Sequence, residues 1–288
     1  MIYLIIVTVL WAFSVSLIGE YLVGLDSYFL VFLRVFLASL IFIPFTKFKG
    51  VFKKLQISLL LIGSVQIGIM YLCLYHSYRF LTVPEILLFT IFTPFYVTII
   101  YDILHKQFNA LYLVSAFVAV LGAYIIRYQN VNSDFLIGFI FVQAANICFA
   151  IGQSAYKYTI EKYQVSDQKE IFGYFHFGAL IITAVAVLAL GNFEKMNPSE
   201  LQWGILIWLG VVASGIGYFL WNKGATMVDA GTLAIMNNAL IPAGIFVNIL
   251  FWGKVENYVS LSIGTAVIIF SLWLHAKFVK LKKSKPIS

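Results

Sequence analysis

The chain has 288 residues, of which 62% are apolar and 11% are charged. A soluble domain carries about 25% charged residues, so this composition excludes a water-soluble fold and predicts an integral membrane protein. The 19 basic and 12 acidic residues give a net charge of +7, an excess whose meaning depends on where the lysines and arginines lie.

Long apolar runs follow one another along the whole chain. A helix needs about 20 predominantly apolar residues to cross the hydrocarbon core, and such runs lie at 2–19, 28–46, 56–77, 81–101, 110–126, 135–156, 171–190, 203–221, 231–252 and 258–276. We interpret the first run as a retained helix, because no Lys or Arg precedes it and further spans follow. The sequence therefore predicts an all-α integral membrane protein with ten transmembrane helices.

The basic residues are distributed unevenly between the two sides of the membrane. With the N-terminus in the cytoplasm, fourteen lysines lie in cytoplasmic loops and the tail, whereas the opposite side holds only Arg79, Arg127, Lys195 and Lys254. The positive-inside rule then places both termini in the cytoplasm. We expect the basic tail, 278–288, to face membrane lipid and not nucleic acid.

The two halves of the chain resemble each other. The stretch Gly68-Ile-Met-Tyr71 recurs as Gly215-Ile-Gly-Tyr218, and Pro94 and Pro242 each lie near the centre of a span. These matches predict two five-helix repeats, 1–127 and 134–277. Because five is odd, the repeats must be inverted in the membrane, the plan of alternating-access transporters. A duplicated structural protein is the alternative.

Arg34 is a charged residue inside a predicted span, about 9 Å below the outer surface at 1.5 Å per residue. A charge at this depth is costly unless it faces a partner or a water-filled cavity. Two interpretations stay open. Arg34 pairs with Glu85 or Glu20 in a structural salt bridge, or its planar fork holds the carboxylate of a substrate.

Amide side chains concentrate on two of the spans. Gln143, Asn146, Ala150, Gln153 and Lys157 are spaced to share one face of a helix. This face either hydrogen-bonds to neighbouring helices or lines a polar cavity. Asn237 and Asn238 precede Pro242, whose missing N–H leaves a backbone carbonyl unpaired nearby, and this favours a cavity.

Aromatic and histidine residues are less specific signals. Tyr71 on one span and Trp221 on another belong to aromatic stripes, which either pack between helices or contact a ligand. His176 aligns with Arg34 between the repeats and is either a gating group on the cytoplasmic side or a core histidine. No metal-ligand spacing, nucleotide-binding loop or catalytic motif is present. We therefore expect no metal, no cofactor and no enzymatic activity.

Ten spans, inverted repeats and central prolines together resemble the EamA-type branch of the drug/metabolite transporter superfamily over the whole chain. Longer sequence words are similar to those of the bacterial inner-membrane biotin transporters of that branch. They are Leu10-Trp-Ala-Phe-Ser14, Gly19-Glu-Tyr-Leu22, Asp26-Ser-Tyr-Phe29, Ile125-Ile-Arg-Tyr128, Gly210-Val-Val-Ala-Ser-Gly-Ile-Gly-Tyr218 and Val228-Asp-Ala-Gly-Thr232.

The resemblance implies a secondary transporter that takes up biotin by alternating access, as one polypeptide without an obligatory protein partner. Biotin offers a carboxylate, an apolar bicycle and a ureido group, which require a cation, aromatic walls and amides. In that order the substrate-binding candidates are Arg34, then Trp11, Tyr71 and Trp221, then Asn146, Asn237 and Asn238. The candidates for gating or for shaping the site are Glu85, Pro94, His176 and Pro242.

The sequence is also compatible with other functions. An EamA-type carrier that exports or imports amino acids, carboxylates or amines has a similar plan, and for an amine Glu85 becomes the anchor in place of Arg34. A membrane sensor or assembly subunit without transport is a second alternative. An integral-membrane enzyme is disfavoured because no paired carboxylates or histidine cluster lie at one depth.

Overall fold

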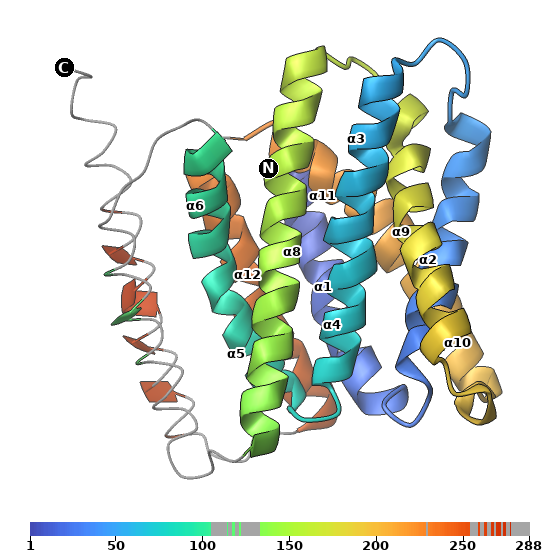
Figure 1. The fold of residues 1–288 in the computed structure, drawn as a ribbon. Helices are drawn as coiled ribbons and strands as arrows, with labels where there is room; N and C mark the ends of the chain where they lie inside the picture. Colours follow the sequence, from blue (N-terminus) through green and yellow to red (C-terminus); the bar gives the residue numbers. More distant parts are fainter. Residues whose placement is uncertain are drawn as a thin grey trace.

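The computed structural model describes residues 1–104, 133–228 and 230–253, with isolated helical positions in 114–121 and 259–277. The predicted spans 110–126 and 258–276 and the tail 278–288 lie outside this part, apart from those positions. Throughout the described part every regular element is helical (Figure 1). In chain order the elements are α1 (Ile2–Tyr21), α2 (Ser27–Phe42), η1 (Ile43–Phe45), α3 (Lys53–Gly63), η2 (Ser64–Ile69), α4 (Met70–Ser77), α5 (Val83–Phe89), η3 (Thr90–Phe92), α6 (Thr93–Leu104), α8 (Ser133–Tyr163), α9 (Lys169–Leu190), η4 (Phe193–Lys195), α10 (Glu200–Trp208), η5 (Leu209–Ile216), α11 (Gly217–Thr226) and α12 (Ala230–Trp252).

Most of these elements join into long apolar helices. Within the described residues, seven helical segments are long and apolar enough to cross a membrane, and α12 contains a shorter apolar stretch, Met236–Trp252. They coincide with the eight predicted spans that fall in this part of the chain. The prediction of an all-helical membrane protein is confirmed at this level.

Several boundaries differ from the prediction by a few residues, and at two of them polar groups lie in the added turns. The helix predicted to end at residue 156 continues to Tyr163, where Lys157 and Glu161 form an ion pair one turn apart with N and O at 3.1 Å. The helix predicted to begin at residue 203 begins at Glu200, because Ser199 and Gln202 form a capping box. A capping box thus sets the start of α10, and an ion pair lies in the added turns of α8.

Three spans change their helical type midway. α3 continues into α4 through the π-helical η2, and α10 continues into α11 through the π-helical η5. α5 is joined to α6 by a 3-10 turn, η3, just before Pro94. Gly68 lies in η2 and Gly215 in η5, so both π segments occur at positions that the sequence comparison pairs. Short π segments are frequent at functional sites.

The loops identify the two ends of the bundle. At one end, called here the Asp26 end, the Asp26 N–H donates to the Lys195 carbonyl at 3.0 Å. At the other, the Lys47 end, the Lys47 N–H donates to the Glu170 carbonyl at 2.8 Å. α1 therefore ends beside the end of α9, whereas α8 ends at the opposite side, and α1 and α8 run in opposite directions. In Figure 1 the Asp26 end is at the bottom and the Lys47 end at the top.

Helix packing follows the same pairing in both halves. α1 packs on α12 and α11, while α8 packs on α6 and α4. α2 packs on η5, α9 packs on η2, and α2 and α9 also pack on each other. Glycines allow the closest approaches: a Cβ at Gly63 would lie 1.7 Å from the Phe175 carbonyl oxygen, and one at Gly178 would lie 1.8 Å from that of Leu60. Small residues at membrane helix crossings serve this purpose.

Candidate functional site

A cavity lies between the two halves of the bundle, bounded by α1, α2, α4, η3, α6, α8, α11 and α12. Its empty volume, which includes the space at its open mouth, is about 700 Å³. Six of the seven side chains predicted to bind substrate line it: Trp11, Arg34, Tyr71, Asn146, Trp221 and Asn237. Asn238 does not.

Arg34 is held in the cavity wall by neutral groups. It is 1% exposed and lies two turns into α2. Asp26 caps the start of α2, where its carboxylate accepts the Phe29 N–H at 2.8 Å. The Arg34 Nε donates to Ser214 Oγ, Nη1 donates to the Tyr75 hydroxyl at 3.0 Å, and Nη2 donates to Ser14 Oγ at 3.0 Å. The Tyr71 ring centre is 4.4 Å from the guanidinium carbon, a cation–π contact.

These contacts leave two donors of the guanidinium unused. It has five N–H groups, one on Nε and two on each Nη, and three of them are taken by hydroxyls. One N–H remains on each of the two terminal nitrogens. A carboxylate can accept one hydrogen bond from each terminal nitrogen of a guanidinium.

No carboxylate in the described part of the chain lies within ion-pair distance of Arg34. Glu85 instead accepts the Thr82 N–H at 2.7 Å and the Thr82 hydroxyl at 2.9 Å, and so caps the start of α5. The salt bridge from Arg34 to Glu85 or Glu20, left open by the sequence, is therefore not formed. A buried cation surrounded by neutral groups is costly, and a bound anion would offset that cost.

The aromatic residues form a wall beside Arg34. The Trp11 ring centre is 4.9 Å from those of both Tyr218 and Trp221 and 5.8 Å from that of Phe149. The Trp11 Nε1–H donates to the Ala213 carbonyl in η5 at 2.9 Å, and the Trp221 Nε1–H donates to Gln153 Oε1 at 3.0 Å. Because both indole N–H groups are used, the two tryptophans present apolar ring surface to the cavity.

The predicted asparagines differ in how they are engaged. Asn146 donates from Nδ2 to the Phe89 carbonyl at 2.8 Å. Asn237 is used at both ends of its amide, since Nδ2 donates to the Leu233 carbonyl at 2.8 Å and Oδ1 accepts from Gln153 Nε2 at 3.4 Å.

Asn238 is a correction to the prediction of substrate contact. It is buried and does not line the cavity, and its amide makes no hydrogen bond within the described structure. Adjacent residues on a helix point about 100° apart, and here Asn237 lines the cavity whereas Asn238 does not. α12 continues through Pro242 without a break, and the missing N–H of Pro242 leaves the Asn238 backbone carbonyl without its helical donor.

His176 lies in an aromatic layer away from the cavity. It is fully buried, its ring is stacked on Phe42 with centres 5.2 Å apart, and it packs edge-on against Phe172 at 5.2 Å. Neither ring nitrogen has a hydrogen-bond partner in the described structure. His176 therefore packs between α2 and α9 and does not contact the cavity.

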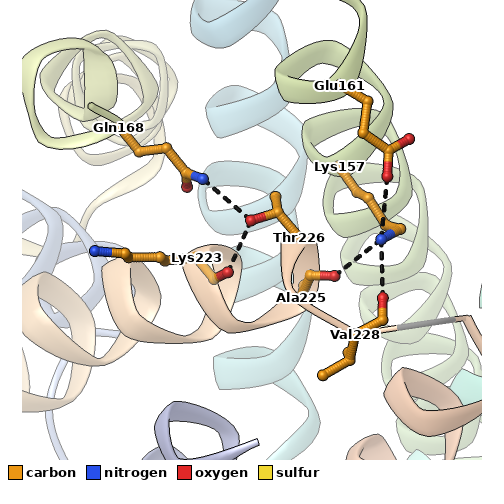
Figure 2. A network of polar contacts seen from close by, with 7 residues as sticks. All are labelled: Lys157, Glu161, Gln168, Lys223, Ala225, Thr226 and Val228. Carbon is orange, nitrogen blue, oxygen red and sulfur yellow. Dashed lines mark hydrogen bonds and ion pairs between the residues drawn. The ribbon is translucent and has the colours of Figure 1, made fainter. Parts of the chain in front are cut away.

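A polar network at the Lys47 end joins α8 to the end of α11 (Figure 2). The Lys157 ammonium donates to the carbonyls of Ala225 at 3.2 Å and Val228 at 2.9 Å and pairs with Glu161 at 3.1 Å. A cation at the carbonyl end of a helix is favourable, and here that helix is α11. Gln168 adds a bond to the Thr226 hydroxyl at 3.1 Å. This Lys157 network ties α8 to the end of α11.

Sequence reasoning missed the two serines that hold Arg34. Ser14 and Ser214 come from α1 and η5, far apart in sequence, and a serine in an apolar helix usually bonds its own backbone. A usable signal was the three-residue spacing from Trp11 to Ser14, which places both on one helix face. For Ser214 the signal was its place directly before Gly215 in the recurring stretch.

Comparisons with known proteins bear on this site. The model of the EamA-like transporter family matches residues 1–128. A protein of Pseudomonas aeruginosa named "Probable biotin transporter" is 50% identical, with 95% of this chain and 96% of that protein covered. This chain belongs to the EamA-like transporter family. It is thus a multi-pass membrane protein of a transporter family and not an enzyme, as the sequence resemblance predicted.

Further relatives of this EamA-like protein are similar along nearly their whole length. The "Biotin transporter" of Escherichia coli (strain K12) is 49% identical, covering 98% of this chain and 95% of its own. The "Biotin transporter" of Salmonella typhimurium is 50% identical, covering 96% and 93%. A crystal structure that is 13% identical superposes with a TM-score of 0.69 over 95% of both chains, which shows a shared fold.

Proposed function

We propose that this EamA-like protein is a secondary transporter that takes up biotin across the bacterial cytoplasmic membrane. The observation that carries the proposal is Arg34, a buried cation in the cavity wall whose contacts in the described structure are with neutral groups and leave one N–H on each terminal nitrogen. The names of relatives at 49% and 50% identity support biotin as the anion.

The cavity offers a group for each part of the ligand. Arg34 faces the carboxylate, the rings of Trp11, Tyr71 and Trp221 face the apolar bicycle, and the amide of Asn146 faces the ureido group. The alternative of an amine carrier required Glu85 as the carboxylate that binds the amine. Glu85 instead caps α5 and does not line the cavity. An anionic substrate fits this site better than a cationic one.

The direct test is transport by the purified chain in proteoliposomes. We expect radiolabelled biotin to accumulate, unlabelled biotin to compete, and lipoate and amino acids to compete weakly. Empty liposomes are the control. Uptake blocked equally well by an amino acid would favour another carrier of the family, and absence of any accumulation would favour a sensor or assembly subunit.

Transport by alternating access requires two exchanging arrangements, and we assign it to inverted repeats over 1–127 and 134–277. The opposite directions of α1 and α8, the matched π segments and the paired helix contacts support this assignment. We infer that the Lys157 network, which ties α8 to the end of α11, keeps the Lys47 end closed, so that access to the cavity would come from the Asp26 end. Opening to the other side requires that network to separate.

The proposed orientation places the Lys47 end and the tail 278–288 in the cytoplasm, because basic residues concentrate there. In a chain with Cys73 and Cys148 replaced by alanine, Lys195→Cys should react with an impermeant thiol reagent in intact cells. Lys53→Cys should react only after the membrane is opened. Preferential labelling of position 53 from outside would reverse the orientation.

A further inference from the structure

The span formed by α5, η3 and α6 changes its hydrogen bonding beside the cavity. Pro94 has no N–H, so the Thr90 carbonyl lacks its usual donor four residues later. The Thr93 N–H donates to the Thr90 carbonyl instead, which closes the 3-10 turn. The Phe89 carbonyl, four residues before Thr93, thereby loses its helical donor.

Asn146 on α8 supplies a donor to this carbonyl. Its Nδ2 donates to the Phe89 carbonyl at 2.8 Å and to Gln143 Oε1 at 3.3 Å. Both partners only accept hydrogen bonds, so they determine which end of the Asn146 amide carries the nitrogen. Its Oδ1 consequently points away from them, and it accepts no hydrogen bond from the described residues. Asn146 lines the cavity.

Thr93 brings a hydroxyl to the same wall. The Thr90 hydroxyl donates to the Leu87 carbonyl at 2.6 Å, but the Thr93 hydroxyl makes no hydrogen bond within the described residues. Thr93 lines the cavity and is 4% exposed. This hydroxyl is therefore available to hydrogen-bond to a ligand or water in the cavity.

We infer that Thr93 and Asn146 together recognise one edge of the ureido ring, an inference that rests on biotin being the substrate. Such an edge carries an acceptor, the carbonyl oxygen, beside a donor, the N–H. The Thr93 hydroxyl donates to the oxygen and Asn146 Oδ1 accepts from the N–H. Asn237, whose amide is bonded at both ends, and Asn238, which lies off the cavity, take no part.

This arrangement makes the part of the cavity lined by Thr93 and Asn146 selective for the ureido group. A site built to hydrogen-bond a polar group rejects analogues that leave its groups unpaired. Pro94 acts at a distance as a positioning residue, because the 3-10 turn it imposes frees the Phe89 carbonyl that orients Asn146. The selectivity at Thr93 is separate from that at Arg34, which concerns the carboxylate end.

Equilibrium binding of radiolabelled biotin to the purified full chain tests the inference. The competitors are biotin amide, which lacks the anion, and the analogue whose ureido oxygen is replaced by sulfur, a weaker acceptor. Thr93→Val, which replaces the hydroxyl by a methyl group of similar size, should weaken biotin binding about 10- to 100-fold. It should also reduce the preference for biotin over the sulfur analogue, while the preference over biotin amide persists.

Two matched variants control for folding. Thr183→Val makes the same change at a buried threonine of α9 whose hydroxyl bonds its own helix and does not line the cavity, and it should bind biotin like the parent. Thr93→Ser restores the hydroxyl and should restore most of the affinity. If Thr93→Val folds poorly, the same two preferences are measured in Thr93→Ala.

The outcomes separate the inference from the proposed function. Parental affinity and an unchanged preference over the sulfur analogue in Thr93→Val would overturn the role of Thr93 and leave the Arg34 site standing. Failure of the parent protein to bind biotin would refute the proposed function itself. Loss of both preferences together would assign Thr93 to the general shape of the cavity and would also overturn the inference.

Discussion

Arg34→Ala is expected to abolish biotin uptake at normal levels of membrane protein. The variant removes the cation that offers two N–H groups to the substrate carboxylate, and hydrogen bonds to a charged group contribute about 1.5–3 kcal/mol each. Biotin affinity should therefore fall by about 100-fold or more. Arg34→Lys keeps the charge but loses the planar fork, so it should retain transport with a clearly raised KM.

The measurement is uptake in proteoliposomes, with protein amount and thermal unfolding followed in parallel. Arg79→Ala, which removes an exposed arginine near the Asp26 end, is the matched control and should transport normally. Biotin amide should compete poorly against the parent protein. An Arg34→Ala variant with parental KM would contradict the assignment of the carboxylate to this residue.

The double variant Arg34→Ala, Glu85→Ala distinguishes a ligand site from a structural ion pair. If Arg34 and Glu85 stabilised each other, removing both would restore abundance and uptake. Because Glu85 caps α5 through Thr82, we expect no recovery, and some further loss of stability from the missing cap.

Lys157→Met is expected to loosen the closure of the Lys47 end. Met keeps an unbranched apolar side chain but removes the ammonium that contacts two carbonyls of the α11 terminus and Glu161. The loss of these charged contacts should favour the arrangement open at the Lys47 end. Biotin binding from the Asp26 side should weaken by about 10-fold, the population shift that corresponds to about 1.4 kcal/mol.

Reactivity of a reporter cysteine measures this opening. Ser154→Cys, at a buried position of α8, should react faster with an impermeant thiol reagent in inside-out vesicles when combined with Lys157→Met. Lys162→Met removes an exposed lysine of the same helix and should leave the rate unchanged. Equal rates in the Lys157 and Lys162 variants would mean that the Lys157 network does not control access.

The sequence alone determined the class of the protein and the positions of its spans in the described part. The reason is physical. A helix needs about 20 apolar residues to cross the membrane, and a polar or charged group within it is costly unless it faces a partner or a water-filled cavity. This second rule singled out Arg34 and Asn146 before their surroundings were known. It also drew attention to Pro94, whose missing N–H follows from the residue type alone.

Only the tertiary structure decided which polar groups meet. The partners of Arg34 come from α1, α4 and η5, and no periodicity within one helix indicates that Ser14, Tyr75 and Ser214 converge on it. Likewise, the sequence gives no reason to prefer Asn237 or Asn238 as the cavity residue, but the orientation of α12 places Asn237 in the cavity wall. Contacts between helices depend on how whole helices pack against one another. In an apolar bilayer the hydrophobic effect does not drive that packing, so the apolar pattern of a single sequence does not reveal it.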